Sequence, residues 1–476
     1  MRIGLRWWGT GLLVALAVAW WLVTDIRRAT ATLAATAQTG VSSDVAPLRA
    51  TLVLSLGEQI FKTSDFGGGG ASRHPLFGSL PRGVIREHQA LRELLRKQNV
   101  RVLDVRDVLN SAIRNARRQG KLADWIKQTF PATAQEALLR SETLDADSIL
   151  NFRDDHFYAR TPDGLFDPLF PGLPSMYWAR DFAISTPKGI LIGNGQYYRR
   201  SLENAAARLI FRFADELKPF PIVFDAAQEG VHLDGGDTIV LDEKTLLLGV
   251  GNRSSREAAA KLAQKLQLDV LAVAMPPADK QSGLNRQLLH LDSIFNLVDK
   301  NKILAVPFFL EKRFNENNPL KPLLLGLAAQ MDAMRAAQPE REMSRPDDVR
   351  LTVEVMPQVG WVTKYEAGSG KATPLNLKLV DYFRERGYQV VYVGGEQGAL
   401  PLDKYVTERA MYELRWQGAN VVQLRPGRVI AYEHNQHTND ALRRAGVEVL
   451  TFPGELLSIN NGGPHCLLMP LVRGDQ

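Results

Sequence analysis

A single cysteine, Cys466, occurs in the 476 residues of the sequence. This scarcity excludes an internal disulfide and a cysteine-rich zinc site, so no disulfide pattern indicates the redox compartment. Other metal-ligand patterns are also missing. His434 and His437 stand close together, but no HExxH motif and no third clustered ligand accompany them. We therefore expect no metal and no cofactor.

A large charge excess is absent as well. Lys and Arg number 58 against 52 Asp and Glu, and the formal net charge of +6 is spread along the chain. Such a distribution is typical of solvated helix faces rather than of a nucleic-acid surface, so we expect no nucleic-acid partner. The 45% hydrophobic fraction is ordinary for a globular protein. The sequence does not indicate an oligomeric state.

A long uncharged run is present near the N-terminus. Residues 7–24 are 18 uncharged residues with Trp pairs near both ends, and a helix of that length spans about 27 Å, close to the hydrocarbon core of a bilayer. The run exceeds the ~7 to 15 apolar residues usual for a signal peptide, and Arg27 and Arg28 come directly after it, so an uncleaved anchor is favoured over a cleaved signal. The sequence predicts a single-pass membrane protein with an anchor or signal segment at 1–28 and a linker at 29–46.

The orientation of this anchor is less clear, because basic residues flank it on both sides. Short anchors with basic starts commonly export the domain that is attached to them. We therefore lean towards a folded domain on the periplasmic side of a bacterial inner membrane.

From Pro47 to the C-terminus, short apolar segments typical of strands alternate with helical patterns. Segments 50–56 and 350–357 are among the expected strands. Residues 107 to about 150 have a helical pattern with exposed basic positions, which indicates a helical insert. Two hairpin-like strands, a helix and a further strand recur along the chain. This recurrence favours a symmetric α/β repeat over a single doubly wound sheet.

Polar clusters stand at predicted strand ends or turns, and the lone cysteine lies on a glycine- and proline-rich loop. A carboxylate beside a Gly-Gly turn is most often an Asx turn, and a lone cysteine is most often a buried apolar residue. Taken together, however, a thiol, an imidazole and several carboxylates form the set required for thiol attack on a cationic carbon. The segments are YWARDFAIST (177–186), VHLDGGDTIVL (231–241), LLHLDSIFNLVD (288–299) and NNGGPHC (460–466).

Five segments in order resemble the motif series of the arginine deiminase and amidinotransferase superfamily, whose members modify guanidino groups. The resemblance extends from about residue 47 to the C-terminus, and the helical insert is similar to that of arginine deiminase itself. It implies a catalytic domain over 47–476 that folds as a five-bladed pseudo-symmetric α/β propeller, a pentein, with its active site on the axis. The segments are RDFAIST (180–186), LDGGDTIVLDEKTLLLGVGNRSS (233–255), HLDSIFNLVD (290–299), PGRVIAYEHNQHTNDALRRAGVEVLTFPGELL (426–457) and GGPHCLLMPLVR (462–473).

The resemblance also implies a role for each matching residue. Cys466 would attack the guanidinium carbon and form a covalent thiouronium intermediate, and His290 would act as acid and then as base. Asp181 and Asp292 would each accept hydrogen bonds from guanidinium N–H groups. Asp234 would orient His290 from a position where arginine deiminases carry the longer Glu.

The positions implied to hold the substrate's α-carboxylate match the arginine deiminase pattern only in part. Arg253 matches one such position, and Arg200 is a second candidate. Asn461, however, stands where arginine deiminases carry an Arg. Because a buried carboxylate requires a well-placed cation, the sequence predicts a preference for a guanidine whose α-carboxylate is absent or modified. Asp237, beside the Gly-Gly pair, is expected to serve the turn.

The sequence therefore predicts a guanidino-group hydrolase of the arginine deiminase type with a small-molecule substrate. An amidinotransferase and an arginine dihydrolase remain alternatives, since the same motifs serve all three. A membrane-tethered binding module on a retired enzyme scaffold is a further alternative, suggested by Asn461, Asp234 and the expected anchor.

Overall fold

A computed structural model describes residues 40–56, 80–141, 143–150, 158–160, 166–168, 173–196, 198–280, 282–337 and 346–474. These residues belong to one compact unit, Gly40–Asp475. The expected anchor and most of the expected linker lie outside the described residues.

Five sheets share one topology. In each, two strands pair antiparallel, and the second of them pairs in parallel with a third strand that comes after at least one helix. The first unit joins the two ends of the described chain, because the last strand pairs with β2. The strands are β20, β2 and β3 (Met469–Arg473, Leu48–Val53, Arg101–Asp104); β6 to β8 (Ala183–Thr186, Gly189–Ile192, Ile222–Asp225); β9 to β11 (Thr238–Asp242, Thr245–Val250, Asp269–Ala274); β12, β13 and β16 (Phe295–Asp299, Lys302–Ala305, Gln389–Tyr392); and β17 to β19 (Val422–Arg425, Arg428–Tyr432, Glu448–Phe452).

The helices between the second and third strands cover the sheets with apolar faces. In α10, the Ser255 side chain caps the first turn by accepting from the backbone N–H of Ala258, and the buried residues recur at helical spacing. Each fully buried Leu of such a face contributes roughly 1.5–3 kcal/mol relative to an exposed one. The helices are α3 (Leu80–Lys97), α9 (Tyr198–Phe213), α10 (Arg256–Leu266), α15 (Leu379–Arg384) and α18 (Gln436–Arg444).

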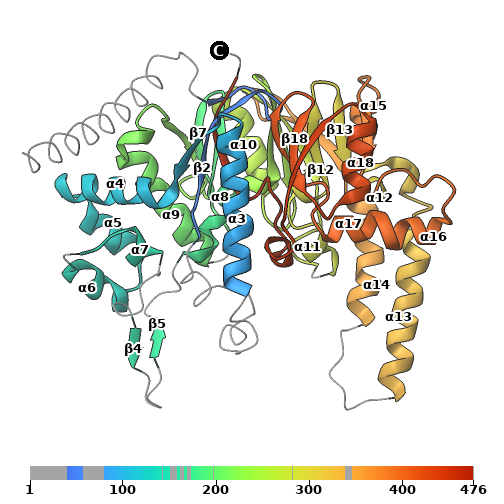
Figure 1. The fold of residues 1–476 in the computed structure, drawn as a ribbon, viewed down its shortest axis with the longest axis horizontal. Coiled ribbons are helices and arrows are strands. Elements are labelled where there is room, and N and C mark those ends of the chain that lie inside the picture. The colour runs from blue at the N-terminus through green and yellow to red at the C-terminus, as the bar shows by residue number, and fades with distance from the viewer. Residues whose placement is uncertain are drawn as a thin grey trace, which may run out of the picture. The chain divides into compact units, whose positions relative to one another are not determined.

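Helices also form over the residues of the expected helical insert, and they lie together beside α9 (Figure 1). Their bounds are α4 (Val105–Arg118), α5 (Leu122–Thr129), α6 (Ala132–Arg140) and α7 (Ala146–Ile149). Short elements complete the described chain: β1 (Gly40–Val41), β4 (Tyr158–Arg160), β5 (Phe166–Pro168), α8 (Ala179–Phe182), α11 (Leu284–Gln287), α12 (Pro307–Leu310), α16 (Leu402–Tyr405) and α17 (Met411–Arg415).

A second insertion, between β13 and β16, was not expected. Helices α13 (Leu320–Ala337) and α14 (Pro346–Val355) extend away from the sheets in Figure 1. Strands β14 (Trp361–Tyr365) and β15 (Ala372–Lys378) then widen the β9–β11 sheet to five strands. The expectation of a strand at 350–357 is wrong, because these residues form the end of α14 and the turn after it.

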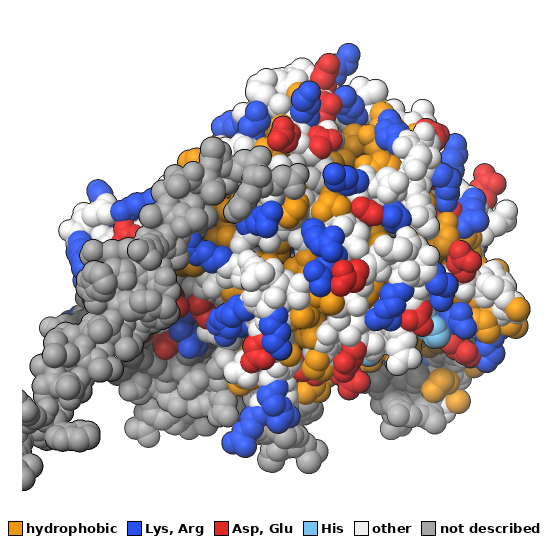
Figure 2. All heavy atoms as spheres, turned by 45° about the horizontal axis from the view of Figure 1, so that its top comes forward, with side chains coloured by type: hydrophobic (Ala, Val, Ile, Leu, Met, Phe, Trp, Pro, Cys, Tyr) orange, Lys and Arg blue, Asp and Glu red, His pale blue; other side chains and the backbone are white. Residues whose placement is uncertain are grey.

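The predicted membrane localisation is wrong. Across the parts of the chain that the structure describes, no helix has both the length and the apolar character needed to cross a bilayer. Residues 1–28, on which the prediction rested, fall outside those parts. On the face drawn in Figure 2, Lys and Arg side chains are interspersed with Asp and Glu side chains, in keeping with the small net charge.

Candidate active site

The polar residues of the site, all but Asn420 of which were singled out in the sequence, converge because they occupy equivalent places in the repeat. Each lies just before the first strand of its unit, at the same edge of the sheets. The residues are Asp181 before β6, Asp234 before β9, His290 and Asp292 before β12, Asn420 before β17 and Cys466 before β20. The repeat thus brings together side chains that are far apart in the sequence.

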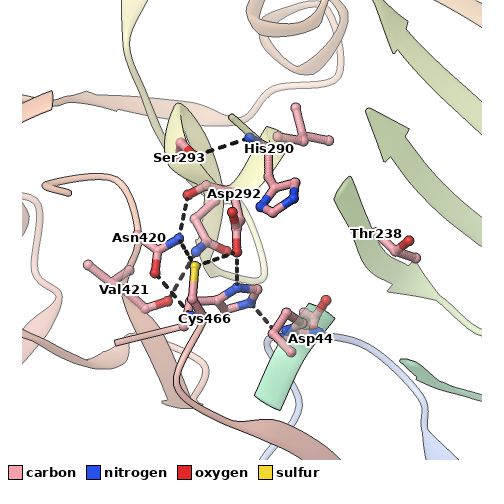
Figure 3. Close-up of polar contacts among 12 residues, drawn as sticks. Asp44, Thr238, His290, Asp292, Ser293, Asn420, Val421 and Cys466 are labelled. Carbon is pink, nitrogen blue, oxygen red and sulfur yellow. Dashed lines mark hydrogen bonds and ion pairs between the residues drawn. The ribbon is translucent and has the colours of Figure 1, made fainter. Parts of the chain in front are cut away.

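Cys466 is buried and held from two sides (Figure 3). Its Sγ accepts a hydrogen bond from Asn420 Nδ2 at 3.2 Å, and its backbone N–H donates to Asn420 Oδ1 at 3.2 Å. Sγ also lies 3.5 Å from Asp292 Oδ2. Burial raises the pKa of the Cys466 thiol well above its ordinary value, and the nearby charges of Asp292 and Asp181 add to this. The thiol is therefore protonated at neutral pH before a cation binds.

His290 lies between two carboxylates. Its Nε2 is 3.3 Å from Asp234 Oδ2, and its Nδ1 is 3.9 Å from Asp181 Oδ1. Burial lowers the pKa of His290, but the charges of Asp181 and Asp234 outweigh it and raise the pKa to about 9. Gly236 packs so closely on the imidazole that a Cβ there would lie 2.5 Å from Nδ1, which explains the glycine of this turn.

The pKa values of Asp181 and Asp234 are shifted in opposite directions. Burial, followed by the charge of Asp234, raises the pKa of Asp181 to about 6, although Arg200 and His290 oppose this. Burial also acts to raise the pKa of Asp234, but the contact with His290 prevails and lowers it. Asp234 and His290 therefore form a buried ion pair at neutral pH.

A chain of hydrogen bonds supports Asp292 from behind. His465 Nδ1 is 2.9 Å from Asp292 Oδ2, and its Nε2 is 2.6 Å from Arg180 Nη2. Because an arginine only donates, Nε2 accepts and Nδ1–H donates to Asp292. Burial and the charge of Arg180 lower the pKa of His465, so its ring is neutral. Arg180 in turn meets Asp44 at 3.4 Å.

Several buried carboxylate oxygens at the site have no hydrogen-bond donor among the described residues. They are Asp181 Oδ1, both oxygens of Asp234 and Asp292 Oδ1. Asp234 Oδ2 is close to His290 Nε2 without the alignment of a hydrogen bond. Buried acceptors without donors are costly, so the site is built for a ligand that carries several N–H donors and a positive charge.

Arg200 shows that Asp181 binds a guanidinium group. Its Nη2 donates to Asp181 Oδ2 at 2.8 Å, and its Nη1 donates to Glu203 Oε2 at 2.8 Å. This places Arg200 against the carboxylates instead of leaving it available for a carboxylate ligand. Arg253 comes after β10, and its positive charge helps to lower the pKa of Asp234.

Asn461 has a partner that the sequence did not reveal. It adopts a left-handed backbone conformation with φ of 61°, and its Oδ1 accepts from Arg415 Nη1 at 2.8 Å. Arg415 is the last residue of α17, so a cation from another element stands beside the position where the sequence lacks one.

Asp237 makes the turn contacts expected of it. It accepts from Ser254 Oγ at 2.7 Å and from the backbone N–H of Leu291 at 3.1 Å. It thereby ties the Gly-Gly turn to the segment that carries His290. Burial raises the pKa of Asp237 to about 7.

Sequence reasoning overlooked Asn420, His465 and Arg415. His465 directly precedes the cysteine and Arg180 directly precedes Asp181, so adjacency to predicted site residues was an available signal. Asn420 and Arg415 lie in no motif, and only the packing of the fifth unit brings them to the site.

Asp181, Asp234 and His290 also have the spacing of a metal-ligand group. The neighbouring carboxylates raise the pKa of His290 to about 9, however, so a metal ion would have to displace a proton from the ring. The group fits an organic cation better than a metal.

Comparisons with known proteins agree with this chemistry. The family model for arginine deiminase matches residues 125–473. An arginine deiminase of Mycoplasma capricolum is 25% identical over 417 residues, covering 82% of this chain and 87% of the relative. One of Listeria monocytogenes is 26% identical over 431 residues, covering 84% and 90%. Among solved structures, the N-terminal domain of the cyanobacterial arginine dihydrolase ArgZ has a TM-score of 0.46 at 11% identity, covering 89% of this chain and 98% of that one.

Proposed function

Because the chain belongs to the arginine deiminase family and is thus a hydrolase of a guanidino C–N bond, we propose that Cys466 is its nucleophile and His290 its acid and base. One observation carries this assignment. Buried carboxylate oxygens that have no donor within the described part of the chain lie around a buried thiol and an imidazolium. A guanidinium group supplies the missing N–H donors, the positive charge and an electrophilic carbon.

The substrate guanidinium lies between the thiol and the carboxylates in this proposal. Asp181 Oδ1 and Asp292 Oδ1 accept its N–H groups. The contact between Arg200 and Asp181 supports this role, since it is a guanidinium–carboxylate pair at 2.8 Å. The 3.5 Å contact between Sγ and Asp292 Oδ2 supports a position of the thiol beside the bound group.

Substrate binding promotes ionisation of the thiol. The carboxylates that raise the pKa of Cys466 are neutralised once a cation lies between them and the sulfur, and the thiol then releases its proton to solvent, because His290 is already protonated. The Asn420 amide then donates to the thiolate. The thiolate adds to the guanidinium carbon, the C–N bond to the terminal nitrogen breaks, and the His290 imidazolium gives its proton to the departing ammonia.

The second half of the reaction reverses these roles. His290, now neutral, accepts a proton from water, and the resulting hydroxide adds to the carbon of the thiouronium group. The C–S bond breaks, the hydroxyl proton of the intermediate passes to the departing sulfur and restores the thiol, and a neutral ureido product remains. Asp234, 3.3 Å from Nε2, holds the imidazole through both steps, so the shorter side chain still reaches it.

We also propose that the five topologically equivalent units form the blades of a propeller around this site. The support is that the units contribute residues from corresponding positions, just before their first strands, and that β20 and β2 close the first unit. This arrangement explains why catalytic groups from distant segments meet in one place.

The substrate is best assigned as an arginine-type guanidine with its α-carboxylate. Asn461 alone favoured a substrate without this group, but Arg415 places a guanidinium at Asn461. We propose that this cation, together with Arg253, faces the α-carboxylate, and that Arg200 does not, because Asp181 and Glu203 already hold it.

The test is a turnover assay of the full chain with arginine, agmatine and an arginine-containing peptide, in which ureido product, urea and ammonia are measured. Ureido product and ammonia in equal amounts, with loss of turnover in Cys466→Ser, are expected. Urea or a second ammonia would indicate a different guanidino chemistry. No turnover of any guanidine, with a thiol that resists alkylation even when a guanidine is added, would favour the retired binding module.

A further inference from the structure

A second depression lies on the widened β9–β11 sheet. It has a volume of about 400 Å³ and is open to solvent. Strands β10, β11 and β14, the first turn of α10 and the turn before β14 line it. None of the residues assigned to the active site lines it.

The unexpected insertion creates this depression. Helix α10 packs on β10, β11 and β14, and Arg256 in its first turn lines the depression together with the β14 side chains. Alternate residues of β14 face the space, whereas Val362 between them packs into the core on the opposite side. Ala272, paired with Thr363 across the sheet, and Ala274 form a shallow floor because their side chains are small.

Two aromatic side chains form the walls. Trp361 is fixed by a hydrogen bond from its Nε1 to the carbonyl of Pro357 at 2.9 Å. Tyr365 is only 8% exposed, and its hydroxyl has no hydrogen-bond partner among the described residues although it lines the depression. Burial raises the pKa of Tyr365, so this hydroxyl remains a donor at neutral pH.

A cation stands at the end of the same space. Arg256 opens helix α10, is exposed, and forms no hydrogen bond or ion pair with another described residue. Its charge acts on Tyr365, so the two side chains are close. The N-terminal end of an eleven-residue helix also favours a negative group, although Glu257 of the same first turn is acidic and its charge acts on Tyr365 in the opposite sense to that of Arg256.

We propose that this depression binds a small planar aromatic anion. The ring lies over Ala272 and Ala274 between Trp361 and Tyr365, and the carboxylate or phosphate meets Arg256 and the Tyr365 hydroxyl. The volume falls in the range of small-molecule sites, roughly 300–1,000 Å³. Aromatic walls and a single cation match a ligand with one flat apolar face and one charged end.

Isothermal titration calorimetry of the full chain tests the proposal with two probes, adenosine 5′-monophosphate and indole-3-acetate. These distinguish an aromatic phosphate from an aromatic carboxylate. At least one is expected to bind with a Kd of about 1 mM or tighter. Inorganic phosphate and acetate, which lack the ring, are expected to bind at least about tenfold more weakly. The bound probe is expected to change the fluorescence of the wild type but not of Trp361→Phe.

Two variants test whether the probes bind in this depression. Arg256→Ala removes the cation, and Ala274→Leu fills the floor; each is expected to weaken binding about tenfold or more. Arg335→Ala, an exposed arginine on α13, is the matched control and is expected to bind as the wild type does. Thermal melting checks folding, and Arg256→Ala decides the outcome if Ala274→Leu does not fold.

Three results would overturn the proposal. They are the absence of binding by both aromatic anions, binding that is unchanged in Arg256→Ala, and phosphate or acetate binding as tightly as the aromatic probes. These results concern only the second depression, so they leave the guanidino chemistry of Cys466 untouched.

Discussion

The two sides of the active site differ in how their polar groups are satisfied. On the thiol side, Cys466, Asn420, Asp292 and His465 are joined by hydrogen bonds, and His465 is neutral. On the imidazolium side, His290, Asp181 and Asp234 carry charge, and several of their atoms lack an aligned partner among the residues that the structure describes. The thiol side is thus largely organised before the substrate arrives, with Asp292 Oδ1 left to accept from it, whereas the imidazolium side is completed by the substrate's N–H groups and positive charge.

Removing the imidazole should produce the largest effect. His290→Ala is expected to lower kcat by on the order of 10²–10⁴-fold, because both proton transfers lose their acid and base. Rapid-quench mass spectrometry is expected to show slower formation of the Cys466 adduct. A decrease of less than about tenfold would mean that another group moves the proton.

A smaller decrease in kcat is expected when one hydrogen bond to the Cys466 sulfur is removed. A hydrogen bond to a charged group contributes about 1.5–3 kcal/mol, so Asn420→Ala should lower kcat by roughly ten- to a hundredfold and slow alkylation of Cys466 in the presence of a guanidine. Asn439→Ala, which removes a buried amide bonded to the Tyr432 carbonyl, is the control for general destabilisation. Equal losses in both variants would contradict a specific role for Asn420.

Arg415, which donates to Asn461 on the loop that carries Cys466, is expected to affect substrate binding. Arg415→Ala is expected to raise KM for arginine about tenfold and to leave agmatine, which lacks the α-carboxylate, unchanged. Arg443→Ala removes a surface pair with Asp440 and serves as the control. If both substrates change equally, Arg415 supports the turn and does not meet the carboxylate.

The smallest expected effect is a shift in the pH dependence of kcat/KM, which the charged residues of the imidazolium side control. His290, with a pKa of about 9, loses its proton as pH rises, so kcat/KM should fall above pH 9. Asp181, with a pKa of about 6, becomes neutral as pH falls, so kcat/KM should also fall below pH 6. Asp234→Asn removes a charge that raises both pKa values, and both limbs should move about one unit or more to lower pH.

Steady-state rates between pH 5 and 10 measure this shift. Asp299→Asn, which alters an acid paired with Lys302 outside the active site, should leave both limbs in place. An alkaline limb that stays near pH 9 in Asp234→Asn would show that Asp234 does not control His290.

The sequence anticipated some elements better than others. The recurring order of strands and helices indicated a repeat, and five sheets of one topology are present. Segment 350–357 was expected to be a strand because it is a short and largely apolar segment. Instead Pro346, Asp347 and Asp348 start a helix, and its acidic first turn suits the helix dipole. Local pattern alone did not reveal that this segment comes after α13 in an insertion.

The sequence by itself determined which reactive groups this chain carries and in what order, because motif residues such as Cys466, His290 and Asp181 are local features of their segments. Only the tertiary structure decided which of them meet and in which charge state. The pKa values of these groups depend on burial and on charges contributed by distant segments. The partners of Asn461 and Cys466, Arg415 and Asn420, lie 46 residues away from them along the chain, and such contacts are set by the packing of the units and not by any local pattern.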